Sequence, residues 1–318
     1  MKENIIYNKS CTQMDDVDDS TVGLVVTSPP YFSAKDYGYS LDYGFDLDSY
    51  NDYLSFLKDV FTECHRVLDG GRFIIVNTSN IIVMTSKYRI DNIRLPIVPD
   101  TQRVLSEIGF EFVDDIIWKK PESACINRQA NFYQTRRPLS YRPNQVTEYL
   151  LVYRKKGDGK DYFKNIDDRT MVLSDVSDDY ETNNVWDIRP ETNSKHPAPY
   201  PIELPQKCIK YYSFVEDIVL DPFMGSGTSA IASLMENRKY IGYELNKKFI
   251  KMANSRISEE NSKVFNLSLD DKYEINKSKI ESRKAVAFCK TKKKKSNSPE
   301  YVNAQGNEQP SMFDEGGE

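Results

Sequence analysis

Five consecutive residues near the start of the chain, Thr27-Ser28-Pro29-Pro30-Tyr31, combine groups that could hold an amino group attached to a flat ring. Adjacent prolines lack backbone N–H groups and restrict the backbone, which leaves carbonyl oxygens free to accept hydrogen bonds. Ser28 adds a hydroxyl acceptor, and Tyr31 adds an aromatic face for stacking. A ring amine is a poor nucleophile because its lone pair is delocalised, and acceptors on its two N–H bonds favour the geometry that frees the pair. The motif therefore predicts a site that activates a ring amine.

A second group of residues follows an apolar run in the last third of the chain, at Asp221-Pro222-Phe223-Met224-Gly225-Ser226-Gly227-Thr228. Glycines allow close approach of a ligand, and a helix that starts here would offer free N–H groups. Asp221 could meet an amino-bearing ligand, and Glu244 ends the next apolar run, where a carboxylate can hold ribose hydroxyls. A Walker phosphate loop is disfavoured because no Lys follows the second glycine. A purely structural turn is the simpler alternative for either motif alone, and their joint presence favours a binding site.

The apolar patterning predicts the elements that must position these residues. Strands are predicted at 22–26, 72–77, 112–118, 149–153, 218–220 and 240–244, and helices at about 50–68, 100–108, 229–236 and 247–257. The strand, loop, helix and strand after residue 218 imply parallel strands joined by a right-handed crossover. We therefore expect an α/β fold. The polar stretch from 155 to 201 is expected to be an insertion outside the core, and the polar tail after 262 to be loosely ordered.

Composition limits the class of protein. The chain has 318 residues, 39% of them hydrophobic, and no stretch approaches the roughly 20 apolar residues of a membrane span. The first ten residues lack the zones of a secretory signal, so we expect a cytoplasmic protein. Five scattered cysteines without a CxxC pair, and only two histidines, favour buried inert thiols over disulfides or a zinc site.

Charge is distributed unevenly along the chain. The net charge of the chain is −5, which alone argues weakly against a nucleic-acid partner. Residues 119–156, however, have a net charge of +7, and the rest of the chain has a net charge of −12. Such separation suits a surface that faces a polyanion, although a solvated basic loop is the simpler alternative. The basic residues that we expect to contact a nucleic acid are Lys119, Lys120, Arg128, Arg136, Arg137 and Arg142.

The two motifs together resemble the amino-methylating DNA methyltransferases of bacterial restriction-modification systems, which act on N4 of cytosine or N6 of adenine. The order of the motifs, SPPY first and DPFMGSGT last, resembles the β group of that family. Residues 65–72, 116–121 and 195–205 are similar to further segments of the family, so the resemblance covers about residues 5–260. One departure is Asn8-Lys9-Ser10-Cys11, where many relatives carry Gly-Asp.

The resemblance implies a Rossmann-like methyltransferase fold with a mostly parallel central sheet, helices on both faces and a permuted motif order. It implies S-adenosylmethionine as methyl donor, no metal, and double-stranded DNA as partner, with a cognate restriction endonuclease acting on the same site. A membrane partner is not expected. It also implies a catalytic domain at 1–260, a target-recognition insertion at about 122–194, and a partly disordered extension at 261–318.

The resemblance also implies roles for individual residues. Ser28, Pro29 and Pro30 would contact the target amine, and Tyr31 would stack on a base rotated out of the duplex. Residues 196–201 would close over the cofactor, and Glu244 would hold its ribose. The methionine end of the cofactor would be lined by Asp221, Phe223, Gly225, Ser226, Gly227 and Thr228.

Several alternatives stay open at this point. Ser28 in place of Asp favours cytosine N4 over adenine N6 as target, and methylation at cytosine C5 is disfavoured because the chain has no Pro-Cys pair. An RNA or protein-glutamine methyltransferase would share the cofactor motif, but the glutamine group usually shows NPPY. A DNA-binding module without catalysis would not need either motif, and a dehydrogenase would show an early GxGxxG, which is absent.

Overall fold

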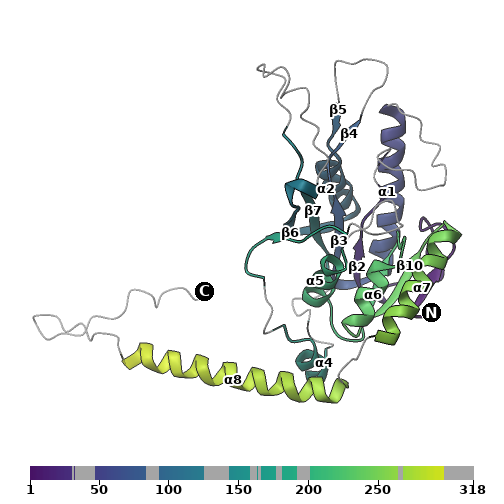
Figure 1. Cartoon of the computed structure of the whole chain (residues 1–318). Helices are drawn as coiled ribbons and strands as arrows, with labels where there is room; N and C mark the ends of the chain where they lie inside the picture. Colours follow the sequence, from purple (N-terminus) through teal and green to yellow (C-terminus); the bar gives the residue numbers. More distant parts are fainter. Residues whose placement is uncertain are drawn as a thin grey trace, which may run out of the picture.

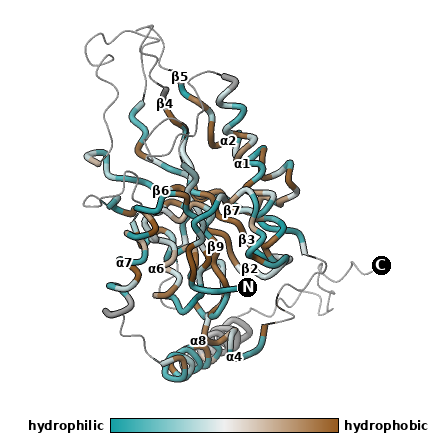
Figure 2. The backbone as a smooth tube through the Cα atoms, turned by 90° about the vertical axis from the view of Figure 1, so that its right-hand side faces the viewer, coloured by the Kyte–Doolittle hydropathy of each residue, from teal (hydrophilic) through white to brown (hydrophobic). Residues whose placement is uncertain are grey.

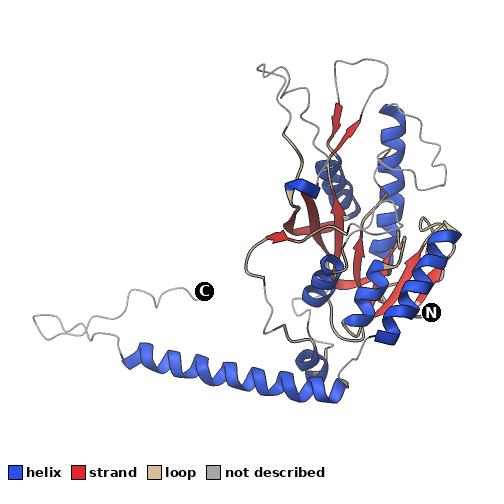
Figure 3. Ribbon diagram, viewed as in Figure 1, coloured by secondary structure: helices blue, strands red, loops and turns tan. Residues whose placement is uncertain are grey.

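The computed structural model describes residues 1–30, 32, 47–83, 93–124, 143–157, 163, 166–176, 181–191, 201–263 and 268–296. Within these residues the main sheet has eight strands in the order β1-β10-β9-β2-β3-β7-β6-β8 (Figures 1 and 3). The strands are β1 (Ile5–Tyr7), β2 (Val22–Thr27), β3 (Leu68–Thr78), β6 (Phe110–Lys119), β7 (Thr147–Lys155), β8 (Val185–Asp187), β9 (Ile218–Asp221) and β10 (Lys239–Tyr243). A separate two-stranded sheet pairs β4 (Ile81–Val83) with β5 (Ile93–Leu95).

Helices cover both faces of the main sheet (Figure 1). One face packs against α1 (Leu47–Val67) and α2 (Ile97–Ile108), and the other against α5 (Glu203–Tyr212) and α6 (Thr228–Met235). The other helices among the described residues are a 3₁₀ turn η1 (Glu122–Ala124), α4 (Asp168–Leu173), α7 (Lys247–Lys263) and α8 (Leu269–Ser296). The expected α/β architecture is confirmed.

The sheet is parallel except for β7, which runs antiparallel to both of its neighbours, β3 and β6. The chain passes from β2 to β3 on one side of the sheet and from β9 to β10 on the other, while β2 and β9 lie next to each other. The strand order therefore reverses between β2 and β9. In open α/β sheets the carboxyl ends of the strands at such a switch point leave a crevice for a ligand.

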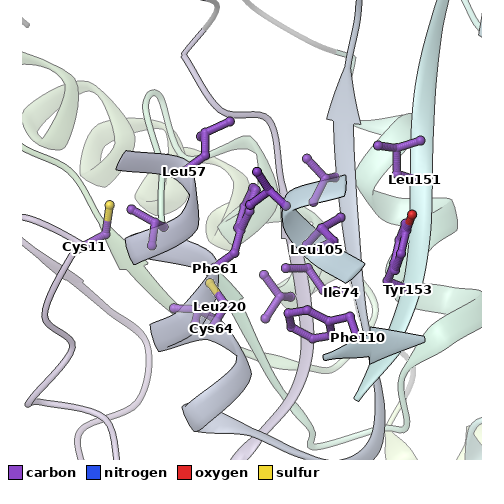
Figure 4. Packing of buried hydrophobic residues seen from close by; sticks show 14 of the residues in the cluster. Cys11, Leu57, Phe61, Cys64, Ile74, Leu105, Phe110, Leu151, Tyr153 and Leu220 are labelled. Carbon is purple, nitrogen blue, oxygen red and sulfur yellow. The ribbon is translucent and has the colours of Figure 1, made fainter. Parts of the chain in front are cut away.

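The core consists of two layers that follow the alternation of side chains along each strand. Val25, Ile74 and Leu220 face α1 and α2, whereas Val26 and Ile75 belong to the layer beneath α5. Figure 4 shows the first layer, in which side chains of the helices and strands interdigitate. The central strands are hydrophobic along most of their length in Figure 2, as expected for strands buried on both faces.

Each predicted strand and helix exists in the structure. The helix predicted at 100–108 begins three residues earlier, at Ile97, and ends where predicted because Gly109 adopts a φ of 110°, which suits glycine. The interpretation of 155–201 as an insertion outside the core is wrong for residues 185–188. β8 pairs with β6 as the edge strand of the main sheet, and Trp186 and Ile188 are buried in the second core layer.

The expectation of a loosely ordered tail is wrong for residues 269–296, which form the single long helix α8. Its first half packs on α4, where Arg169 pairs with Asp270 at 2.5 Å and the Asn276 amide donates to the Val172 carbonyl at 2.9 Å. Residues of high helix propensity, mainly Lys with Glu, Arg and Ala, allow the helix to continue beyond this contact. In Figure 1 the helix extends away from the sheet. Residues 297–318 lie outside the described part.

Cys11, Cys64 and Cys208 are free thiols, and all three are buried, as expected. Burial raises the pKa of the Cys11 thiol and that of the Cys208 thiol to about 12, which keeps both protonated and unreactive. Across the described residues, no helix combines the length and apolar character needed to cross a membrane.

Candidate active site

The two sequence motifs meet at the switch point of the sheet. β2 ends at Thr27 and β9 ends at Asp221, on adjacent parallel strands. The Thr27 hydroxyl donates to Oδ1 of Asp221 at 2.7 Å, a buried bond between residues 194 positions apart in the sequence. The proline-containing motif and the glycine loop therefore lie side by side.

Asp221 is the junction between these segments. Besides the Thr27 hydroxyl, its carboxylate accepts from the Ser229 hydroxyl of α6 at 2.6 Å and from the Phe223 N–H at 3.0 Å. The side chain is fully buried, and desolvation raises its pKa although these three hydrogen bonds act in the opposite direction. We expected Asp221 to meet an amino-bearing ligand. The contacts present are instead internal, and a contact with a ligand stays a prediction.

The glycine loop is held against α7. Gly227 has a φ of +81°, and a Cβ at this position would lie 2.9 Å from the Cβ of Ala253, so only glycine allows α6 to begin here. Arg256 of α7 donates to the Ser226 carbonyl at 2.6 Å and to the Thr228 hydroxyl at 3.2 Å. The sequence interpretation did not identify Arg256, because nothing in its local pattern distinguishes it from other basic residues on a helix surface.

Glu244 follows β10 and faces the same loop. Its Oε2 accepts from the Gly225 N–H at 3.0 Å, and its Oε1 accepts from the Asn246 N–H at 2.6 Å. Burial is the main influence on the carboxyl group and raises its pKa, although the backbone donors oppose this shift. Asn8 donates to the carbonyls of Glu244 and Leu245, both at 2.9 Å. The N-terminal segment that departs from the family pattern therefore contributes to the site.

A recess of about 390 Å³, a volume that includes its opening to solvent, connects the two motifs. Its walls are mainly apolar, with the Phe56 and Phe223 rings 5.9 Å apart, and Glu244 supplies a carboxylate. This combination suits a ligand with a flat ring and hydroxyl groups. The recess is lined by Lys9, Ser10, Cys11, Pro30, Phe56, Pro222, Phe223, Tyr243, Glu244 and Leu245.

The proline-containing motif occupies the carboxyl end of β2. Pro29 and Pro30 are buried, and Ser28 is half-buried. The amide of Asn77, on β3, lies 3.4 Å from the Ser28 hydroxyl. Sequence reasoning missed Asn77, which is one polar residue within an apolar strand. Tyr31 and residues 196–200, to which we assigned roles, lie outside the described residues.

The expected DNA-contacting residues are only partly placed. Lys119 and Lys120 lie at the carboxyl end of β6, the same edge of the sheet as the motifs, whereas Arg128, Arg136, Arg137 and Arg142 lie outside the described residues. Lys119 pairs with Asp187 at 3.1 Å, and Lys120 pairs with Glu148. Both lysines line a hollow that is open to solvent, together with Pro121, Glu122, Val146, Asp187, Ile188 and Arg189.

Comparison with known proteins gives a family match across most of the chain. The model of a family described as DNA methylase, of the N6 and N4 type, matches residues 22–255. The chain is 30% identical over 274 residues to the Type II beta methyltransferase M.BslI of Bacillus sp. (strain NEB-606), a match that covers 79% of this chain and 27% of that protein. It is 29% identical over 283 residues to the Type II methyltransferase M.MthZI of Methanothermobacter thermautotrophicus, covering 80% of this chain and 76% of that protein.

Solved structures share the fold. A putative DNA modification methylase of Thermus thermophilus, solved in complex with S-adenosyl-L-methionine, superimposes with a TM-score of 0.62 at 25% identity, over 79% of this chain and 91% of that chain. The PvuII DNA methyltransferase, described as cytosine-N4-specific, gives a TM-score of 0.57 at 17% identity, over 87% of this chain and 92% of that chain. At 17% identity, the similarity to the PvuII enzyme shows a shared fold and nothing more specific.

Proposed function

The chain belongs to the N6/N4 family of DNA methylases and has their Rossmann-like fold, and we propose that it transfers a methyl group to the exocyclic N4 of cytosine in double-stranded DNA. The methyl donor is S-adenosylmethionine. The observation that carries the proposal is the Thr27–Asp221 hydrogen bond, which joins the motif suited to a ring amine to the glycine loop at the switch point.

The lining of the recess suits the adenosine part of the cofactor. Its apolar walls with one carboxylate match the ring and the hydroxyl groups of an adenosine. Glu244 would accept hydrogen bonds from the ribose hydroxyls, while Phe56 and Phe223 would provide apolar contact. Gly225, Ser226, Gly227 and Thr228 would surround the methionine end, as expected from the family. When bound, the cofactor supplies a methyl group on a positively charged sulfur, which an amine can attack directly.

The residues of the chain hold the target amine for that attack. The Ser28 hydroxyl and the carbonyl groups of the proline pair would accept the two N–H bonds of the amine, and Tyr31 would stack on the extruded base. No covalent bond between enzyme and base is required. Positioning two bound reactants can contribute about 7 to 11 kcal/mol at its best, so most of the acceleration would come from geometry.

The choice of cytosine rests on Ser28. Within the family, SPPY is more similar to the cytosine-N4 enzymes and DPPY to the adenine-N6 enzymes, so adenine N6 is the alternative target. The motif order supports placement in the β group. An RNA substrate is the more distant alternative.

Mass analysis of nucleosides tests this proposal. We expect DNA incubated with the protein and S-adenosylmethionine to yield N4-methylcytosine after digestion. N6-methyladenine would overturn the choice of base, and methylation of RNA without methylation of DNA would overturn the substrate.

DNA would approach along the edge where the parallel strands end. Lys119 and Lys120 lie there, and we propose phosphate contacts by them and by Arg128, Arg136, Arg137 and Arg142. Target recognition is proposed for residues 122–194 outside β7 and β8, since these two strands belong to the main sheet. The relatives are Type II methyltransferases, which supports a role in protecting DNA from a cognate restriction endonuclease.

Cofactor binding is expected to weaken in mild acid because of Glu244. Its pKa lies above the ordinary value of 4.5, and only the ionised carboxylate can accept from both ribose hydroxyls and both backbone donors. Affinity should therefore be full above the raised pKa and fall as the pH decreases through it, starting at a higher pH than for an ordinary carboxyl group. Calorimetric titration with S-adenosylmethionine at decreasing pH measures this. The Glu244→Gln variant should bind S-adenosylmethionine more weakly at neutral pH, and its affinity should no longer depend on pH in this range. If the affinities of the variant and the wild type fell in parallel with decreasing pH, the proposed role of Glu244 would be wrong.

A further inference from the structure

A chain of four polar side chains leads from Ser28 across neighbouring strands. The Asn77 Nδ2 on β3 lies 3.4 Å from the Ser28 Oγ and 2.9 Å from the Glu148 Oε2 on β7. The other oxygen of Glu148 is ion-paired with Lys120, directly after β6. We call Ser28, Asn77, Glu148 and Lys120 the serine chain. It runs away from the cofactor recess, whose lining includes none of the four residues.

Glu148 determines which way the Asn77 amide points. If the amide were turned over, Oδ1 would face the Glu148 carboxylate, and two acceptors would repel each other. The observed orientation instead directs N–H groups to both Glu148 and Ser28. Glu148 is itself held, because its side chain is only 12% exposed and Lys120 both pairs with it and lies 4.3 Å from the centre of the Trp118 ring.

This orientation carries a cost in stability. Asn77 is 3% exposed, and its Oδ1 accepts no hydrogen bond from any residue that the structure describes. An unsatisfied buried acceptor costs about 1 to 3 kcal/mol, and an apolar residue of similar size would avoid that cost. The arrangement gains a fixed N–H donor beside Ser28. The unsatisfied oxygen is therefore accounted for by the orientation of the amide, whose donor side faces Glu148 and Ser28.

The consequence for Ser28 follows from the chemistry of a hydroxyl group. The oxygen has two lone pairs and one hydrogen, and without a neighbour the hydroxyl rotates freely. A donor on one lone pair restricts that rotation and leaves the second lone pair pointing in a defined direction. The target amine needs an acceptor in such a defined position.

We propose that Asn77, oriented by Glu148 and Lys120, is a positioning residue of the methyl transfer and holds the Ser28 hydroxyl so that its free lone pair accepts from the target amine. This inference rests on the proposed function of Ser28. Asn77 does not itself touch the cofactor recess. Its effect should therefore appear in turnover and only when Ser28 is present.

A double-mutant cycle tests the proposal, with transfer of labelled methyl groups to DNA as readout. Asn77→Ala is expected to lower kcat about tenfold while leaving KM for S-adenosylmethionine unchanged. In a Ser28→Ala background the same substitution should cause no further loss. Glu148→Gln, which keeps an acceptor for Asn77 but loses the charge that binds Lys120, should lower kcat by a smaller factor.

Two further variants separate positioning from structural support. Asn77→Leu removes the unsatisfied acceptor at similar size but also the donor to Glu148, so the two effects oppose each other and the melting temperature should change little, whereas kcat should still fall about tenfold. Asn276→Ala removes a buried amide between α8 and α4 and should lower the melting temperature without changing kcat.

Additive losses of Ser28→Ala and Asn77→Ala would overturn the proposal, as would wild-type kcat in Asn77→Leu. Failure of the proposed function is distinguishable from both outcomes. If the proposed function were wrong, DNA treated with the wild-type protein would contain no N4-methylcytosine, and no variant would be needed to show this.

Discussion

Replacing Asp221 by Ala is expected to destabilise the protein by about 3 kcal/mol and to reduce methyl transfer to background. Its carboxylate receives the Thr27 hydroxyl, the Ser229 hydroxyl and the Phe223 N–H, all in a buried environment. Alanine would leave three buried donors without an acceptor. It would also remove the link between the end of β2 and the start of α6, so the two motifs would lose their relative position.

Denaturant unfolding and single-turnover methyl transfer measure the two effects. Asp221→Asn keeps the shape and one acceptor oxygen, so it should lose less stability than the alanine variant. Asp217→Ala is the matched control, because Asp217 lies just before the opposite end of β9, where it pairs with Arg72 at 3.2 Å. It should lower stability and keep the wild-type kcat below its melting temperature. Wild-type stability in Asp221→Ala would show that the junction is unimportant.

Replacing Ser28 by Ala is expected to lower kcat about a hundredfold, the size of effect seen when one fixed hydrogen-bonding group is removed from a catalytic site. Ser28 is half-buried at the end of β2 and is not among the residues that line the recess. The substitution should therefore remove a hydrogen bond to the target amine and leave the dissociation constant of S-adenosylmethionine unchanged.

Rapid-quench kinetics and calorimetric titration separate these quantities. Ser282→Ala is the matched control, because this exposed serine of α8 donates to the Ser278 carbonyl of the same helix at 2.9 Å, and it should behave as the wild type. The assignment of the two motifs would be reversed if Ser28→Ala weakened cofactor binding and kept kcat.

The main elements of the site could be read from the sequence. The runs at 22–26 and 218–220 predicted the two strands that carry it, and the combination of SPPY with DPFMGSGT indicated an amine site and a cofactor site. These features are local, because strand alternation, proline restriction and glycine turns depend on residues close together in the chain. The family match over residues 22–255 agrees with that interpretation.

Other features depended on strand order, which local patterns do not report. β8 lies within a polar stretch, and only its pairing with β6 makes Trp186 part of the core. The same holds for Asn77, which lies 49 positions from Ser28, and for Arg256, which lies 28 positions from Thr228.

The sequence by itself therefore determined which residue types could carry the chemistry and on which kind of element each one lies. The tertiary structure decided that Thr27 meets Asp221 and that Asn77 stands between Ser28 and Glu148. The physical reason is that a hydrogen bond acts over about 3 Å, whereas its partners here are brought together only when distant strands take neighbouring places in one sheet.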